Sequence, residues 1–219
     1  MLERYLQALS VEDVGLEDPA ATRERVKDRF TRGATRRMTQ LGMLIGVALD
    51  QLGPNKDDTV VYASEYSETR ALEGYLDSFP TASPTLFQTS IHPSAVQQAL
   101  IGRQQPVGEF FPLTGRSQLV AQAFQTALLS TAPRVLVCGG EERGTWLLEQ
   151  RAASDRTFAF ALALGVEPEG ALARVSLQAV DPEIPAVAFG LPEFCDVLRA
   201  RQSLAVVAAP GLRFRLAWA

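Results

Sequence analysis

The sequence predicts a layered α/β fold, and two observations carry that prediction. Short β-rich runs alternate with amphipathic helical patterns as far as residue 139, and further β-rich runs follow. Strands that alternate with helices favour a sheet packed between helical layers. The chain has 219 residues, of which 47% are hydrophobic. This is enough for one domain with a sizeable core, so we expect a single domain over 1–219.

The first part of the chain combines a charged segment with a clear helix and strand. Residues 1–35 are rich in charge and predict a short helix and a loop. The acidic residues expected to be solvated in that loop are Glu12, Asp13, Glu17 and Asp18. In 36–52, apolar residues recur at spacings of three and four, which predicts an amphipathic helix ended by Gly53-Pro54. The β-rich run 59–63 predicts a central strand.

The predicted core of the domain, 36–177, continues this alternation. The expected helices cover 69–76, 93–101 and 117–129, and the expected strands cover 107–113, 134–139, 157–164 and 171–177. Pro93 suits the first position of a helix, where its missing N–H costs nothing. Pro168-Glu169-Gly170 is a turn signal, so we expect the last two strands to form a hairpin.

The tail, 178–219, predicts a helix at 192–201 and strands at 204–208 and 212–218. We expect it to cover one edge or face of the sheet.

Composition excludes several classes of function. The net charge is −4 and no long basic run occurs, so nucleic acid is not an expected partner. The segment 23–37 is locally basic, either as a solvated face or as a docking patch for an acidic partner. No apolar stretch approaches the ~20 residues of a membrane span, and the amino terminus lacks the apolar region of a secretory signal. Two cysteines, one of them in an apolar strand, indicate a reducing compartment, and we expect a cytoplasmic protein.

Candidate chemical groups are few. His92 is the only histidine, and with two distant cysteines it makes a poor zinc site, so we expect no metal and no cofactor. Thr114 could act as a nucleophile only beside a base, and the more ordinary role is structural or helix-capping. His92 is most simply a helix cap or an internally bonded residue. Glu141 and Glu142 could serve as general bases, but such a pair more often caps a helix or faces water.

Several motifs occur along the chain in an order that supports a resemblance to a known family. They are Arg37-Met38-Thr39-Gln40-Leu41 opening an apolar helix, Val60–Ala63 with Ser64, Ser83-Pro84-Thr85-Leu86-Phe87, Gln105-Pro106 with the strand and Thr114 after it, Val135–Gly140 with Glu141-Glu142, and Phe158–Leu164. In this order they resemble the first half of a β-ketoacyl synthase, the condensing enzyme of fatty-acid and polyketide synthesis. Within this family the chain resembles short chain-length-factor-like proteins, which accompany a complete ketosynthase in type II systems, including those that make aryl polyenes.

The resemblance implies a thiolase-like layered fold truncated to about one half of the duplicated ketosynthase fold. It also implies that the chemistry is incomplete. The position of the family's reactive cysteine holds Thr114, or Gly115 if the gap falls one residue later. The second half of the family fold, with its two catalytic histidines and its glycine-rich loop, has no counterpart here. A ketosynthase needs a thiolate and histidines, so we expect no condensation by this chain alone.

The function implied is that of a non-catalytic partner subunit. A half fold leaves apolar surface that another chain can bury, so we expect a heterodimer with a complete β-ketoacyl synthase, whose acyl tunnel this chain would help to shape. An acyl carrier protein would be an indirect partner, and 23–37 is a candidate patch for it. Phe110 and Phe111 are strand neighbours that point opposite ways, so one could reach the tunnel while the other packs in the core. The candidate interface and tunnel residues are Leu86, Phe87, His92, Phe110, Phe111 and Leu113.

Two alternatives stay open. The chain could be a stand-alone acyltransferase or thioesterase that uses Thr114 with His92, or a homodimeric thiolase-like binding module. Mutation of Thr114 and His92 separates an enzyme from a scaffold, because only the enzyme should lose activity. A neighbouring gene for a complete ketosynthase would count against the homodimer.

Overall fold

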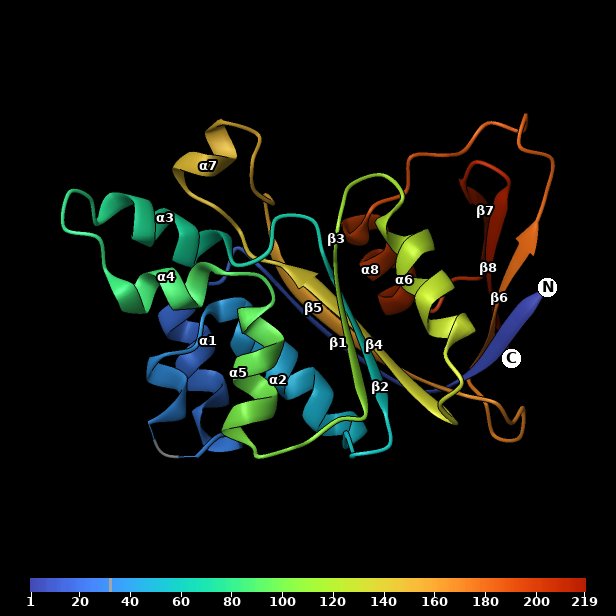
Figure 1. The fold of residues 1–219 in the computed structure, drawn as a ribbon, viewed down its shortest axis with the longest axis horizontal. Helices are drawn as coiled ribbons and strands as arrows, with labels where there is room; N and C mark the ends of the chain where they lie inside the picture. The colour runs from blue at the N-terminus through green and yellow to red at the C-terminus, as the bar shows by residue number, and fades with distance from the viewer. Residues whose placement is uncertain (32) are drawn as a thin grey trace.

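An eight-stranded sheet runs through the computed structural model, which describes residues 1–31 and 33–219 (Figure 1). The strands are β1 (Leu2–Gly15), β2 (Thr59–Ser64), β3 (Glu109–Thr114), β4 (Arg134–Glu141), β5 (Thr157–Gly165), β6 (Ala173–Ala179), β7 (Leu204–Ala209) and β8 (Leu212–Trp218). Their order across the sheet is β3-β2-β4-β5-β1-β6-β8-β7. β2 is parallel to both β3 and β4, and the other neighbouring pairs are antiparallel.

Helices cover both faces of this sheet, which confirms the layered α/β prediction. The helices are α1 (Pro19–Val26), α2 (Gln40–Leu52), α3 (Thr69–Asp77), α4 (Pro84–Ser90), α5 (Ser94–Gly102), α6 (Leu119–Leu129), α7 (Trp146–Glu149) and α8 (Leu191–Ala200). Two short 3₁₀ segments, Lys27–Arg29 and Ala34–Arg36, precede α2. Helices α2 and α5 pack on one face of the sheet, and α6 and α8 pack on the other.

Strand β2 shows why both faces are covered. Val60 and Tyr62 pack with α2 and α5, while Val61 and Ala63 pack with α6. A strand buried on both faces has a continuous apolar sequence instead of an alternating one. On the α6 side the core is aromatic, since the Phe124, Phe194 and Phe214 rings lie 4.7–6.0 Å apart between centroids.

The expectation of only a helix and a loop in 1–35 is wrong, because β1 occupies the interior of the sheet. β1 pairs with β5 over Tyr5–Gly15 and with β6 over Leu2–Leu6. A short helix, α1, does follow it. The charged residues of β1 concealed the strand, because their partners lie far along the chain. Asp13 is not solvated: its Oδ2 lies 2.9 Å from the guanidinium of Arg199.

The predicted hairpin between β5 and β6 is also wrong, because β1 lies between them. The turn itself is present, with Gly170 at φ +69°. Gly165 ends β5 opposite Tyr5 of β1, and Ala173 begins β6 opposite Leu6. β6 therefore continues in the direction of β5 on the other side of β1, so a short connection is sufficient.

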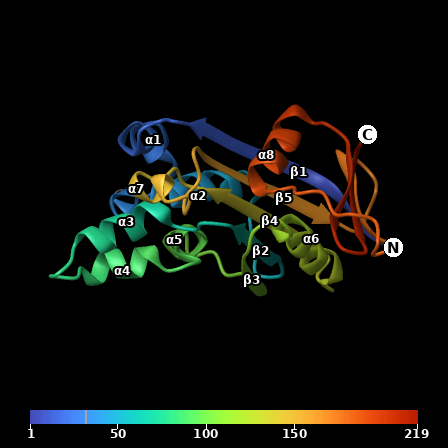
Figure 2. The ribbon, with the colours of Figure 1, turned by 90° about the horizontal axis from the view of Figure 1, so that it is seen from above.

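The tail extends the sheet, as expected of a segment that covers an edge or a face. β8 pairs with β6, and β7 forms the outer edge beyond it. Helix α8 packs on the same face of the sheet as α6. Both termini lie at the end of the molecule that holds β6, β7 and β8 (Figure 1). Figure 2 shows the same sheet from above, with β1 and β5 side by side.

The buried Arg4 joins β1 to the turn before β4. Its guanidinium donates to the carbonyls of Ser130 at 2.6 Å, Ala132 at 2.8 Å and Pro133 at 3.3 Å. We expect Arg4→Met to lower the free energy of unfolding by about 3 kcal/mol, because three carbonyls lose a charged donor. Urea denaturation measures the change, with Arg174→Met, on exposed β6 surface, as the control. Equal effects of the two substitutions would contradict this role of Arg4.

Candidate functional site

The parallel strands β2, β3 and β4 end at the same edge of the sheet. Ser64, the last residue of β2, is paired with Thr114, the last residue of β3. Ala63 is paired with Gly139 of β4, which continues to Glu141. Crevices at the carboxyl ends of parallel strands are the usual binding places in open α/β sheets. The candidate nucleophile position and the two adjacent glutamates are therefore brought to one edge.

Glu141 organises the loop that follows β2. Its carboxylate accepts hydrogen bonds from Ser64 Oγ at 3.1 Å and from the backbone N–H groups of Glu65 at 2.6 Å and Tyr66 at 3.0 Å. Burial raises the pKa of Glu141 to about 8, because desolvation of the carboxylate outweighs these hydrogen bonds. The loop is thus held by a side chain that is protonated in part near neutral pH.

Glu142 caps two helices. Its carboxylate accepts from the backbone N–H groups of Gln40 at 2.9 Å and Arg70 at 3.2 Å, in the first turns of α2 and α3. Burial raises its pKa to about 7. The interpretation of the glutamate pair as helix caps is confirmed for Glu142, and neither carboxylate faces water.

His92 lies in the link between α4 and α5. Its ring stacks on Tyr62 at 5.0 Å between centroids, and its Nδ1 lies 3.0 Å from Ser67 Oγ. Burial lowers the pKa of His92. The expectation of an internally bonded histidine is confirmed, whereas it does not cap α5, whose N-cap residue is Pro93.

A buried polar cluster surrounds this histidine, and sequence reasoning did not find it. Glu68 accepts from Ala95 N–H at 2.7 Å, and burial raises the pKa of Glu68 to about 7. Within residues 1–31 and 33–219, the Tyr62 hydroxyl, Glu68 Oε2 and His92 Nε2 are buried without a hydrogen-bond partner. Glu68 stands four residues after the end of β2 and directly before α3, in a polar stretch that resembles any exposed helix start.

Thr114 is exposed at the end of β3 and does not cap α6. Its Oγ1 donates to the Glu65 carbonyl at 3.5 Å. In the described ranges no hydrogen bond links it to His92, whose Nδ1 is paired with Ser67. The hydroxyl therefore lacks an aligned base in this conformation.

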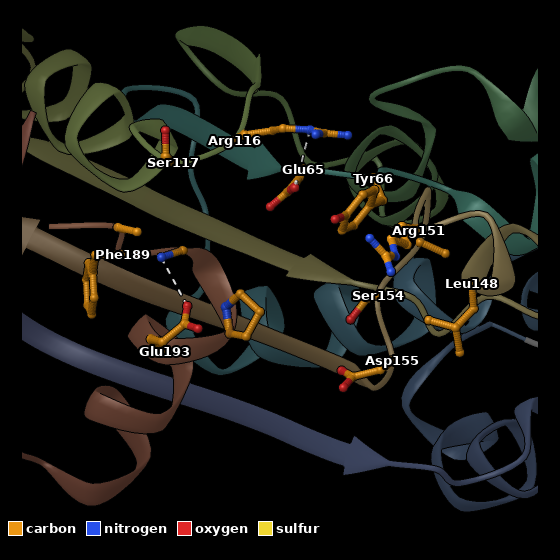
Figure 3. Close-up of a pocket in the computed structure, with 14 residues that line it drawn as sticks. Glu65, Tyr66, Arg116, Ser117, Leu148, Arg151, Ser154, Asp155, Phe189 and Glu193 are labelled. Carbon is orange, nitrogen blue, oxygen red and sulfur yellow. Dashed lines mark hydrogen bonds and ion pairs between the residues drawn. The ribbon is translucent and has the colours of Figure 1, made fainter.

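A cavity of about 460 Å³ opens beside the strand ends (Figure 3). It is bounded by the loops after β2 and β3, by the segment after α7 and by the start of α8. Glu65 and Arg116 face each other across its upper side, 3.7 Å apart, and Glu193 accepts from Gly190 N–H at 3.0 Å below. Its remaining polar lining includes Tyr66, Ser117, Arg151, Ser154 and Asp155. This mixed lining suits a polar group better than a bare acyl chain.

The six interface candidates fall in three places. Phe110 packs with the α2 side of the core, while Phe111 and Leu113 lie on the opposite face of β3. Leu86 and Phe87 lie on α4, where the Phe87 ring contacts Tyr75 at 5.3 Å between centroids. His92 belongs to the buried polar cluster and is half-buried, in the link that follows α4. The structure therefore brings Phe111 and Leu113 together but does not join all six residues into one patch.

The raised pKa values of Glu68, Glu141 and Glu142 predict a pH-dependent stability. Unfolded glutamates titrate near 4.5, so between about pH 4.5 and 8 the folded protein holds more protons than the unfolded chain. We expect the free energy of unfolding to fall as pH rises through this window and to level off above it. Urea midpoints across the range measure this.

Glu141→Gln is the matched variant for this profile. It should flatten the upper part of the window, because an amide does not titrate, whereas Glu169→Gln in an exposed loop should retain the full slope. A free energy of unfolding that rises with pH between 5 and 8 would contradict the prediction.

Three general properties of the described residues complete the site. No three histidine, cysteine, aspartate or glutamate side chains among them come together as a metal-ligand group. None of the helices in 1–31 and 33–219 is both long and apolar enough to cross a membrane. Cys138 and Cys195 are free and buried, and burial raises the pKa of each thiol, to about 12 for Cys195.

Comparison with known proteins identifies similar structures. No protein-family model matches the sequence, and no curated protein sequence matches it either. A chain of the complex described as ketosynthase (ApeO) with its chain length factor (ApeC) from Xenorhabdus doucetiae has a TM-score of 0.68 and 17% identity, over 99% of this chain and 100% of that chain. A chain of the ishigamide ketosynthase/chain length factor has a TM-score of 0.62 and 12% identity, over 83% of this chain and 69% of that chain.

These identities establish likeness of fold. The first similarity extends over essentially the whole of both chains, so a fold of this extent also occurs in a ketosynthase and chain-length-factor complex. The chain has the thiolase-like layered α/β fold.

Proposed function

We propose that this chain is a non-catalytic, chain-length-factor-like subunit that forms a heterodimer with a complete β-ketoacyl synthase. The partner would supply the cysteine and histidines, and this chain would help to shape the tunnel that holds the growing acyl chain. The proposal extends to malonyl-derived fatty-acid, polyketide or aryl polyene chains on an acyl carrier protein. The observation that carries it is the end-to-end likeness to a chain from a ketosynthase and chain-length-factor complex.

The free edge of β3 supports a partner on this side of the molecule. β3 is the edge strand at the end of the sheet opposite to β7, and it pairs only with β2 among the described strands. An unpaired edge can accept a strand from another chain. Pro112 removes one N–H from β3, as is common at edges, but the backbone groups that point away from β2 pair with no other described strand.

The surface around β3 is apolar as well as unpaired. Phe111 is 39% exposed and Ile101, at the end of α5, is 75% exposed. Ile101 also lines a largely apolar cavity of about 500 Å³ together with Leu100, Pro106 and Phe110, on the face of β3 opposite to Phe111. Exposed apolar surface of this kind is typical of an interface. We therefore assign Phe110, Phe111 and Leu113 to the partner interface, whereas Leu86 and Phe87 of α4, and His92 after it, remain separate candidates.

Co-expression with the ketosynthase from the same genomic neighbourhood tests the proposal. Size-exclusion chromatography with mass detection should give a stable one-to-one complex, and the chain alone should associate with itself. A monomer or homodimer that ignores the ketosynthase would overturn the heterodimer and favour a homodimeric binding module.

The stand-alone acyltransferase or thioesterase is tested with Thr114→Val, which removes the hydroxyl and keeps the shape. Because Thr114 has no aligned base, we expect the variant to leave condensation by the complex unchanged. The isolated chain should neither transfer acyl groups nor hydrolyse thioesters above background. Thioester turnover by the wild-type chain that Thr114→Val abolishes would support the enzyme instead.

A further inference from the structure

A second cavity, of about 340 Å³, lies among the helices and is lined by arginines. Arg23 comes from α1, Arg36 and Arg37 from the segment before α2, and Arg70 from α3. Thr85 and Thr89 of α4 line the same space. We refer to it as the arginine cavity. It is separate from the cavity at the strand ends, with which it shares no lining residue.

The positive charge in the arginine cavity is little compensated. Across residues 1–31 and 33–219, Arg23, Arg36 and Arg37 form no ion pair with a carboxylate, although the protein as a whole has a net charge of −4. Arg70 lies 3.6 Å from Glu73 Oε2. The acidic residue at the cavity is Glu142, whose oxygens already accept from the Gln40 and Arg70 N–H groups. Four arginines thus line a cavity whose charge favours an anion.

The donors suit a phosphate better than a smaller anion. Guanidinium groups present planar pairs of N–H donors that match phosphate oxygens, and such charged hydrogen bonds are the strong ones. The Nε of Arg23 donates to the Thr35 carbonyl at 3.2 Å, which restrains this side chain at the cavity wall. The apolar lining from Met38, Ala71 and Leu86 could hold the organic part of an ester.

We propose that the arginine cavity binds the phosphate group of a phosphate ester. The ester has two sources: a small molecule free in solution, or a prosthetic arm linked through phosphate to an acidic carrier protein. The second source rests on the proposed function, whereas binding of the phosphate itself does not. Both sources share the chemistry that the four arginines recognise.

Calorimetric titration of the full chain tests the phosphate site, with inorganic phosphate and 4′-phosphopantetheine as probes at about 0.15 M salt. Arg36→Ala/Arg37→Ala should weaken binding of each probe at least about tenfold, since two charged donors are lost. Arg213→Ala/Arg215→Ala removes the same charge from another cavity, at β8, and should bind like wild type. Circular dichroism checks that both variants are folded.

Several results would overturn the site: no saturable binding of either probe, equal loss in both double variants, or equal binding of pantetheine without its phosphate. If the site stands, holo and apo carrier protein distinguish the sources. Binding of the holo form alone supports the carried arm, and binding of free phosphopantetheine without the holo protein supports a small molecule. Equal binding of holo and apo forms would overturn the carried arm.

Failure of this site is distinguishable from failure of the proposed function. The ketosynthase complex should survive Arg36→Ala/Arg37→Ala, because α1, α3 and α4, which line the same cavity, lie apart from β3 (Figure 1). Loss of that complex in the variant would show that the arginines serve subunit assembly and would overturn the phosphate assignment.

Discussion

Replacement of Phe111 by arginine is expected to abolish the one-to-one complex with the ketosynthase. Phe111 lies on the edge strand β3 and is 39% exposed, so the substitution places a charge in the proposed interface with little effect on the core. Aromatic residues at the centre of an interface often contribute most of its binding energy. We expect the dissociation constant to rise at least about a hundredfold, which corresponds to ~2.7 kcal/mol. Titration of the purified subunits by surface plasmon resonance measures it.

Ile184→Arg is the matched control for this experiment. Ile184 is 40% exposed and lies in the segment between β6 and α8. In the sheet, β6 is separated from β3 by four other strands. This variant should bind the ketosynthase as wild type does. Normal binding by Phe111→Arg, or an equal loss of affinity in both variants, would exclude β3 as the interface. Size-exclusion chromatography would still decide separately whether a complex forms.

Replacement of Gly140 by alanine should cause the largest loss of stability. A Cβ at this position of β4 would lie 2.3 Å from the Phe158 carbonyl oxygen and 2.9 Å from Ala159 Cα. Backbone atoms of β5 cannot yield as a flexible side chain can, so the pairing of β4 with β5 would have to shift. We expect the free energy of unfolding to fall by about 3 kcal/mol or more, the upper range for overpacking in a core.

Thermal and urea unfolding measure this effect, and Gly102→Ala is the control. Gly102 ends α5 and has no atom within 4 Å of an added Cβ, so alanine there should be neutral or slightly stabilising. A Gly140→Ala protein as stable as wild type would show that the β4–β5 register can relax, and that the double glycine is not required by packing.

The regular elements could be predicted because their signals are local. Helix α2 has apolar residues at every turn and ends at Gly53, and β2 and β4 are apolar runs between turn residues. These patterns depend on residues within one element. The order of these elements along the chain was also sufficient to predict the layered α/β class. It carried the resemblance as well, which the comparisons support at the level of fold.

The place of β1 could not be predicted, because its stability comes from partners distant in sequence. Arg4 of β1 donates hydrogen bonds to the carbonyls of Ser130 and Ala132. Asp13 of β1 forms ion pairs with Arg156 and Arg199. Locally these charges indicate a solvated segment. Burial becomes favourable only when the distant donors and acceptors are in place.

The candidate site shows the same division. The sequence by itself determined which residue types were present: one histidine, a threonine where the ketosynthases that it resembles have a cysteine, two adjacent glutamates and a basic segment at 23–37. Only the tertiary structure decided that Glu141 holds the loop after β2, that His92 stacks on Tyr62, and that Arg70 joins three arginines of that basic segment around one cavity. Such convergence depends on strand register and helix packing, which bring together residues that are far apart in the chain.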